Sequence, residues 1–288
     1  MLLHGRAGIL ESMFKKAFTI LVYLFAAVGF VLTVGYFGVK YGFTNTSGII
    51  DEQRQSFLDG ADGEAPASDM IASLPWTETE EWGVLDAAIR RDADAINRAA
   101  KDANVPARLI VANLITEQLR LFFSDREDYK QFFSPLKILG SQTQFSWGVM
   151  GMKEETAIPV EEHLKDPASP FYPGRAYEHL LDFPATTTDV KTERFTRMTD
   201  QHNHYWSYLY AGLFLKQIET QWRAAGFPIE GNVAVLSTLY NIGFSHSTPN
   251  ASPQVGGAAI DVNGETYSFG GIARDFYYSD LLIDVFPR

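Results

Sequence analysis

The residue best suited to acid–base chemistry is a carboxylic acid on an apolar helix. The pattern VPARLIVANLITEQLRLFF over 105–123 predicts a helix that is apolar nearly all round, and Glu117 is one of its few polar residues. A carboxyl in such surroundings avoids part of the cost of burial by keeping its proton, and a retained proton is what a general acid requires. A structural interpretation competes with this one, in which Asn113, Glu117 and Arg120 form a solvated stripe with Glu117 and Arg120 paired.

Two later segments carry further candidates. In SWGVMGMKEETA, 146–157, two glycines lie among bulky apolar residues, which predicts a tight turn whose backbone another group approaches closely. The spacing differs from that of a phosphate-binding loop, which has more glycine and a lysine directly after it. The third segment is LYNIG, 239–243, at the end of another helical pattern. A plain junction between a strand or loop and a helix is the structural alternative for the glycines.

Taken in this order, the three segments resemble the catalytic domain of lytic transglycosylases and goose-type lysozymes. That family has Glu-Ser on a helix, then Gly-Leu-Met-Gln-Leu-Met-Pro-x-Thr-Ala, then Ala-Tyr-Asn-Ala-Gly. Besides Glu117, the positions that match are Gly148, Met150, Thr156, Ala157, Tyr240, Asn241 and Gly243. Two departures fall at positions that would touch the substrate, since Gln118 replaces the family's Ser and Gly151 replaces its Gln.

The resemblance implies cleavage of peptidoglycan by one carboxyl, with no metal and no cofactor. Glu117 would protonate the oxygen between N-acetylmuramic acid and N-acetylglucosamine, and would then take the proton of the muramoyl C6 hydroxyl as a 1,6-anhydro ring closes. Tyr240 would hydrogen-bond and orient Glu117, and Asn241 would help to fix Glu117 or the substrate. The turn would bring backbone groups close to the sugar, beside an apolar wall from Met150. The residues implied to contact substrate are Gln118, Ser146, Gly148, Met150 and Gly151.

Two other functions remain open. A hydrolytic muramidase of the same fold would need a second carboxyl near the first. The candidates for it are Glu154, Glu155, Asp261 and Asp275. Alternatively, Gln118 and Gly151 would mark a non-catalytic module that binds peptidoglycan or serves as a scaffold in an envelope machine. His202 and His204, two residues apart at the start of a helical pattern, do not share a helix face and are interpreted as structural rather than metal-binding.

The elements that would position these residues are mainly helical. Apolar residues recur at helical spacing over 77–104, 105–123, 204–226, 232–243 and 270–286. Asn263-Gly264 between alternating residues predicts one small β-hairpin. The Pro-rich stretch 158–200 is typical of a long insertion. The expected fold class is therefore mainly α, a lysozyme-like α+β domain with a small β-hairpin, preceded by one N-terminal transmembrane helix.

The N-terminal part of the chain predicts a membrane anchor. Residues 17–39 are 23 positions without a charged side chain, enough to span a bilayer. A cleaved signal peptide is the alternative, but the run is longer than its apolar region and lacks a small-x-small site after it. More basic residues precede the run than follow it, so 1–16 is expected in the cytoplasm. An acidic flexible linker over 40–76 would then lead to an extracytoplasmic domain over 77–288.

Composition limits the classes of partner that the chain can bind. The 288 residues carry a net charge of −11, which argues against nucleic acid because phosphate binding needs a basic face. The chain has no cysteine, so disulfides and thiolate metal sites are excluded. The expected partners are peptidoglycan glycan strands and a membrane, with envelope or virion assembly proteins as further candidates. The expected location is a bacterial inner membrane, with the domain on the periplasmic side, or a virion membrane.

Overall fold

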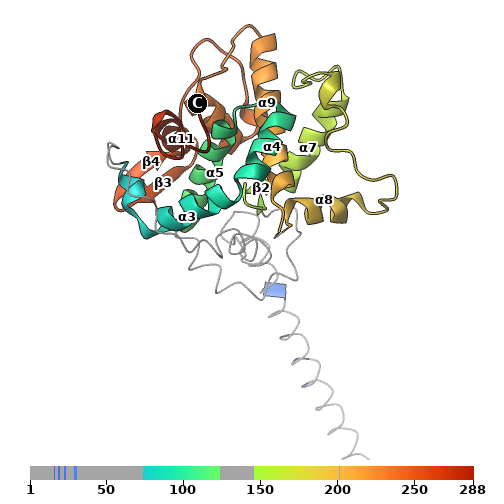
Figure 1. Ribbon diagram of the computed structural model, residues 1–288. Coiled ribbons are helices and arrows are strands. Elements are labelled where there is room, and N and C mark those ends of the chain that lie inside the picture. The colour runs from blue at the N-terminus through green and yellow to red at the C-terminus, as the bar shows by residue number, and fades with distance from the viewer. Residues whose placement is uncertain are drawn as a thin grey trace, which may run out of the picture. The chain divides into compact units, whose positions relative to one another are not determined.

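The computed structural model describes residues 74–123, 146–200 and 202–288, together with Lys16, Thr19, Tyr23, Gly29 and Phe30. Every described residue from Leu74 onward belongs to one compact unit, and the five near the N-terminus belong to another. The larger unit is mainly α-helical, as predicted (Figure 1). Its helices are α3 (Glu80–Arg91), α4 (Ala93–Ala103), α5 (Ala107–Phe122), α7 (Glu154–Lys165), α8 (Val190–Met198), α9 (Tyr205–Ala224), α10 (Val233–Ile242) and α11 (Phe269–Tyr278), with short 3-10 helices η1 (Pro75–Glu78), η4 (Arg175–Tyr177) and η5 (Phe244–His246). Its strands are β1 (Ser146–Trp147), β2 (Met152–Lys153), β3 (Ala259–Val262) and β4 (Glu265–Ser268).

Most of the predicted anchor and linker lies outside the described residues. Within the expected span 17–39, the structure describes Thr19, Tyr23, Gly29 and Phe30, all in helical conformation. Across the part of the chain that is described, no helix has both the length and the apolar character needed to cross a bilayer. At the other end of the expected linker, the side chain of Trp76 is fully buried, so the folded unit already includes this residue.

The first helical pattern is interrupted at a half-buried polar residue that binds two side chains distant in sequence. A single helix was expected over 77–104, but α3 ends and α4 begins around Asp92. The Asp92 carboxylate lies 2.6 Å from Nδ1 of His204 and accepts a 2.7 Å hydrogen bond from the Tyr208 hydroxyl. Tyr208 lies in α9, and His204 is the residue directly before that helix. His204 is therefore engaged in a structural contact, in keeping with its interpretation from the sequence.

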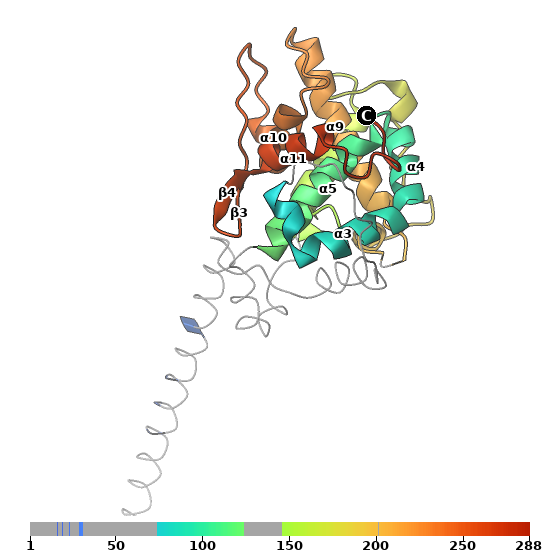
Figure 2. The ribbon, with the colours of Figure 1, turned by 60° about the vertical axis from the view of Figure 1, so that its left-hand side comes forward.

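Helix α5 forms the centre of the unit. Its residues 108–119 are buried without interruption, and it contacts α3, α4, α9, α10, α11 and β3 (Figures 1 and 2). This arrangement confirms the helix that the apolar pattern predicts. It also means that the polar groups in this buried stretch bond mainly to other groups of the protein, because little water reaches them.

The predicted hairpin is present, and the last helix is shorter than predicted. β3 pairs antiparallel with β4, and the turn between them has positive φ at Asn263 (52°) and Gly264 (87°), as a two-residue hairpin turn requires. The Ser268 hydroxyl accepts the backbone N–H of Gly271 and caps α11. The helix then ends at Tyr278 rather than continuing to residue 286.

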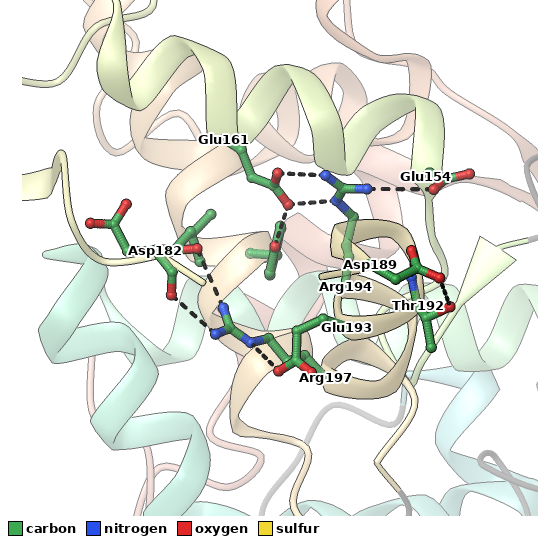
Figure 3. A network of polar contacts seen from close by, with 10 residues as sticks. Glu154, Glu161, Asp182, Asp189, Thr192, Glu193, Arg194 and Arg197 are labelled. Carbon is green, nitrogen blue, oxygen red and sulfur yellow. Dashed lines mark hydrogen bonds and ion pairs between the residues drawn. The ribbon is translucent and has the colours of Figure 1, made fainter. Parts of the chain in front are cut away.

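The stretch 158–200 is tied to the core at both ends. Its beginning forms most of α7, where Val160 and Leu164 are buried. Its end forms α8, whose Arg194 donates to both carboxylate oxygens of Glu161 at 2.6 and 2.8 Å (Figure 3). The Tyr210 hydroxyl of α9 donates to the same carboxylate at 2.5 Å. A buried arginine–carboxylate pair thus joins α7, α8 and α9.

A second buried arginine joins the beginning of α5 to the C-terminal segment. The Arg108 guanidinium is fully buried and makes five hydrogen bonds, all to backbone carbonyl oxygens between residues 276 and 286. It also stacks on the Phe276 ring, 4.5 Å from its centroid. Burial lowers the pKa of Arg108 to about 10, opposed by nearby acidic groups. The carbonyl dipoles are what make this charge tolerable in the core.

We expect Arg108→Met to lower the free energy of unfolding by about 3–5 kcal/mol, because several buried carbonyls lose their donor together. Arg288→Met is the matched control, since Arg288 binds the carbonyls of Tyr278 and Ser279 in the same segment but its side chain is 44% exposed. The control should lose less than about 1 kcal/mol. Urea unfolding followed by tryptophan fluorescence measures both, and equal losses would contradict the role assigned to burial.

Candidate active site

Glu117 lies near the end of α5 and is buried, with 4% of its surface exposed. Its carboxylate oxygen Oε2 accepts hydrogen bonds from Arg120 Nη2 at 2.6 Å and from Nε at 3.0 Å. The two residues are three apart on one helix, the spacing at which side chains meet. The pairing expected by the structural interpretation is therefore present, but the expected solvated stripe is not, because Glu117 and Asn113 are both buried.

The ion pair is electrostatically strong. The charge of Glu117 is the largest cause of a raised pKa at Arg120, ahead of burial, which opposes it. Both guanidinium contacts go to Oε2, so Oε1 receives no hydrogen bond from a described residue. Charge-assisted pairs of this kind favour the ionised carboxylate. In the structure Glu117 is thus paired with a cation from its own helix.

The glycine segment forms a tight hairpin turn against this carboxylate. β1 pairs with β2, and the Gly151 N–H donates to the Gly148 carbonyl across the turn at 3.2 Å. Both glycines have positive φ, 64° and 61°. A Cβ at Gly151 would lie 3.0 Å from Oε2 of Glu117, and one at Gly148 would lie 2.1 Å from the Ser207 hydroxyl oxygen. The group that approaches this backbone is therefore the acid itself on one side and α9 on the other.

Two predicted site residues hold the turn through its carbonyl oxygens. Gln118 Nε2 donates to the Val149 carbonyl at 2.6 Å, and its buried Oε1 finds no partner among the described residues. The Tyr240 hydroxyl of α10 donates to the Met150 carbonyl at 2.8 Å. The expected hydrogen bond from Tyr240 to Glu117 is thus replaced by one to the turn. The Met150 side chain is fully buried and packs in the core.

Tyr240 nevertheless lies within electrostatic reach of the acid. Burial raises the pKa of the Tyr240 hydroxyl well above its ordinary value, the charge of Glu117 raises it further, and Arg120 opposes this. The hydroxyl therefore stays protonated and serves as a fixed donor. Residues from α5, the turn and α10 are brought together around one carboxylate.

The other predicted residues lie further from Glu117 or are described only in part. Asn241 Oδ1 accepts the Ala258 N–H at 2.8 Å, so it fixes the loop before β3. Ser146 pairs with Lys153 through its backbone, and its side chain lies outside what the structure describes. Neither contact involves the acid.

The four acids considered as a second carboxyl all have partners elsewhere. Glu154 is buried and faces Arg194 at 3.5 Å (Figure 3). It also lies 3.6 Å from Lys191. The remaining pairs are Glu155 with Lys153, Asp261 with Thr266, and Asp275 with Arg274. None of them contacts Glu117 in the described part of the chain. Sequence reasoning missed the contacts of Gly148 with α9, for which no local pattern gives a signal.

We expect three substitutions to lower the free energy of unfolding by different amounts. Gly148→Ala should lower it most, Gly151→Ala less, and Gly226→Ala least. Gly226 is the matched control, because it has a positive φ of 82° but nothing within 4 Å of an added Cβ. The Gly226 variant therefore measures the cost of backbone strain alone, about 1–2 kcal/mol of unfolding free energy. The substitutions at Gly148 and Gly151 add a steric clash to this strain. At Gly148 the added Cβ would lie 2.2 Å from the Met198 carbonyl oxygen. Urea unfolding of the three variants ranks them, and three equal losses would contradict close packing at the turn.

Comparison of the chain with family models, with curated proteins and with solved structures gives no match.

Proposed function

We propose that the chain is a membrane-anchored lytic transglycosylase that cleaves peptidoglycan, built on a lysozyme-like α+β domain. The observation that carries the proposal is the convergence of three separate segments on Glu117. Gly151 packs against its carboxylate, Tyr240 binds the carbonyl of Met150 beside it, and Gln118 binds that of Val149. These are the segments that carry the family resemblance, and they meet at the residue to which that resemblance assigns the chemistry.

In the proposed reaction Glu117 acts first as acid and then as base. Its carboxyl proton passes to the oxygen between N-acetylmuramic acid and N-acetylglucosamine as that bond to C1 breaks. The carboxylate then takes the proton of the muramoyl C6 hydroxyl, whose oxygen bonds to C1 and closes the 1,6-anhydro ring. The proton returns to Glu117 and no water is consumed. Tyr240 and Gln118 contribute by fixing the turn that covers the carboxylate.

The partners of the other acids favour this route over hydrolysis. A hydrolase would use a second carboxyl to activate water or attack carbon. Glu154 is buried against Arg194 and Lys191, and the other candidates pair with residues close to them in sequence. A hydrolytic muramidase is thus the less supported alternative.

One observation favours a second candidate function, a non-catalytic module that binds peptidoglycan or supports an envelope or virion assembly. The carboxylate of Glu117 is already neutralised by Arg120, as a purely structural acid would be. A buried pair can persist for packing alone, without chemistry. Assay of the purified chain separates the two functions.

The proposed location follows from the apolar segment 17–39. Two of its aromatic side chains, Tyr23 and Phe30, are each 71% exposed on a helical backbone, which suits contact with lipid. We propose a single-pass protein with 1–16 in the cytoplasm and the residues after 39 outside.

The chain, purified in mild detergent and incubated with peptidoglycan, should release muropeptides with 1,6-anhydro ends, one water lighter than hydrolysed products by mass spectrometry. Glu117→Gln should lower the rate by roughly 100-fold or more, as expected for loss of a general acid. Glu155→Gln changes an exposed acid in the first turn of α7. It is the matched control and should keep the rate. Hydrolysed products would indicate a muramidase, and no release by the folded chain would favour the binding module.

A variant that lacks residues 1–39 should leave the membrane fraction, because it loses the uncharged apolar segment 17–39. The full chain should stay with membranes after an alkaline carbonate wash. A protease added outside spheroplasts should digest the residues after 39 but spare an epitope tag placed before residue 16. Retention of the shortened variant in the membrane would contradict the anchor.

A further inference from the structure

One buried aromatic ring docks the loop that follows α7, residues 166–180. Of these residues, all of which the structure describes, Phe171 alone is buried. The centroid of its ring lies 4.7 Å from that of His163 in α7 and 4.7 Å from that of Phe244 in η5. The Ser169 hydroxyl accepts the Phe171 N–H at 3.1 Å and lies 2.9 Å from Nδ1 of His163. We call residues 166–180 the docked loop.

The ring that receives Phe171 leads to the candidate site. Gly243 follows α10 with a φ of 91°, a conformation that glycine adopts without strain. The chain turns there, and Phe244 packs on the Phe214 ring of α9 with the centroids 4.2 Å apart. Tyr240 packs on the same Phe214 ring at 5.4 Å. These contacts form one continuous series, which we call the ring row, in the order Phe171, Phe244, Phe214 and Tyr240.

Tyr240, at the end of the ring row, is the residue that holds the glycine turn. Its hydroxyl donates to the Met150 carbonyl, and the next residue, Gly151, packs against the Glu117 carboxylate. The contacts of Phe214 with its two neighbours are edge-to-face, a geometry that restricts how each ring can turn. Because protein interiors are closely packed, loss of a ring from the row lets its neighbours shift. The direction of the Tyr240 hydroxyl therefore depends on the whole row.

We propose that Phe171 and Phe244 are positioning residues, through which the docked loop holds Tyr240 and the glycine turn in place against Glu117. The loop thereby acts on the site through a row of packed rings. Loss of its docking loosens the turn first and slows cleavage as a result. Only this second consequence rests on the proposed function.

Hydrogen–deuterium exchange of the full chain in detergent measures the turn without any substrate. The Gly151 N–H is bonded to the Gly148 carbonyl, so exchange in a peptide covering 146–153 reports opening of the turn. In Phe171→Leu this peptide should exchange about fivefold faster or more, relative to a peptide covering α4. Phe171→Tyr keeps the ring and should keep the parent ratio. Equal acceleration of both peptides in Phe171→Leu would indicate general destabilisation and would overturn the inference.

Phe286→Leu is the matched control, because Phe286 is fully buried but lies outside the ring row. It loses a phenyl ring for the same aliphatic side chain, and it should leave the ratio of the two peptides unchanged. Ser169→Ala provides a second variant should Phe171→Leu not fold. It removes only the hydroxyl that binds the Phe171 N–H, and it should accelerate exchange in the turn by a smaller factor.

Tyr240→Phe tests whether the ring row acts through the hydroxyl. This variant keeps the ring but loses the donor to the Met150 carbonyl, so its turn should exchange faster than that of the parent chain. Adding Phe171→Leu to Tyr240→Phe should accelerate the turn no further, because the bond through which the loop acts is already absent. Independent effects of the two substitutions, multiplied in the double variant, would contradict the inference.

Muropeptide release then connects the turn to the rate. On defined glycan strands Phe171→Leu should lower kcat about tenfold and change KM less than about twofold, because a displaced carboxylate impairs the reaction more than binding. Phe286→Leu should keep both parameters. A parent-like kcat in Phe171→Leu, with Glu117→Gln inactive, would overturn the inference and leave the proposed function in place. If Glu117→Gln still releases muropeptides, the proposed function fails, while the exchange measurements still decide whether the docked loop holds the turn.

Discussion

The structure depends on one constraint, which is that α5 is surrounded by other elements along most of its length. Little water reaches the polar groups in its buried stretch, so most of them bond to other groups of the protein. Arg108 at one end takes carbonyl oxygens from the C-terminal segment. Gln118 near the other end takes a carbonyl oxygen from the turn between β1 and β2. Arg108 and Gln118 therefore tie two distant parts of the chain to this helix.

The candidate site follows from the same constraint. A carboxyl placed in a buried position needs either a proton or a neighbouring cation. Glu117 has a neighbouring arginine, and a backbone turn also packs against its carboxylate. The turn can approach so closely only because it lacks a side chain at the point of contact. The site is thus built mainly from backbone held by side chains of α5 and α10.

Much of the fold could be predicted from sequence because its determinants are local. Helical spacing of apolar residues located the helices before residue 124 and after residue 203, but not α7 and α8. Asn263-Gly264 located a hairpin because few other residues accept positive φ. The break at Asp92 could not be predicted, since it accompanies contacts with His204 and Tyr208 more than a hundred residues away. The partner of Tyr240 was unpredictable for a similar reason. A hydroxyl near a carboxylate and a free carbonyl can donate to either, and only the packing of α10 decides.

The contact of Arg108 with the C-terminal segment has a consequence for how the protein is made. During synthesis α5 leaves the ribosome long before residues 276–286 exist, so for that interval its guanidinium has no carbonyl oxygens to bind and cannot be buried. The helices before α11 can associate only loosely until then, with the charge turned toward water. Folding of the core is therefore completed late, when the final turns arrive, and a nascent chain in this state offers apolar surface to chaperones.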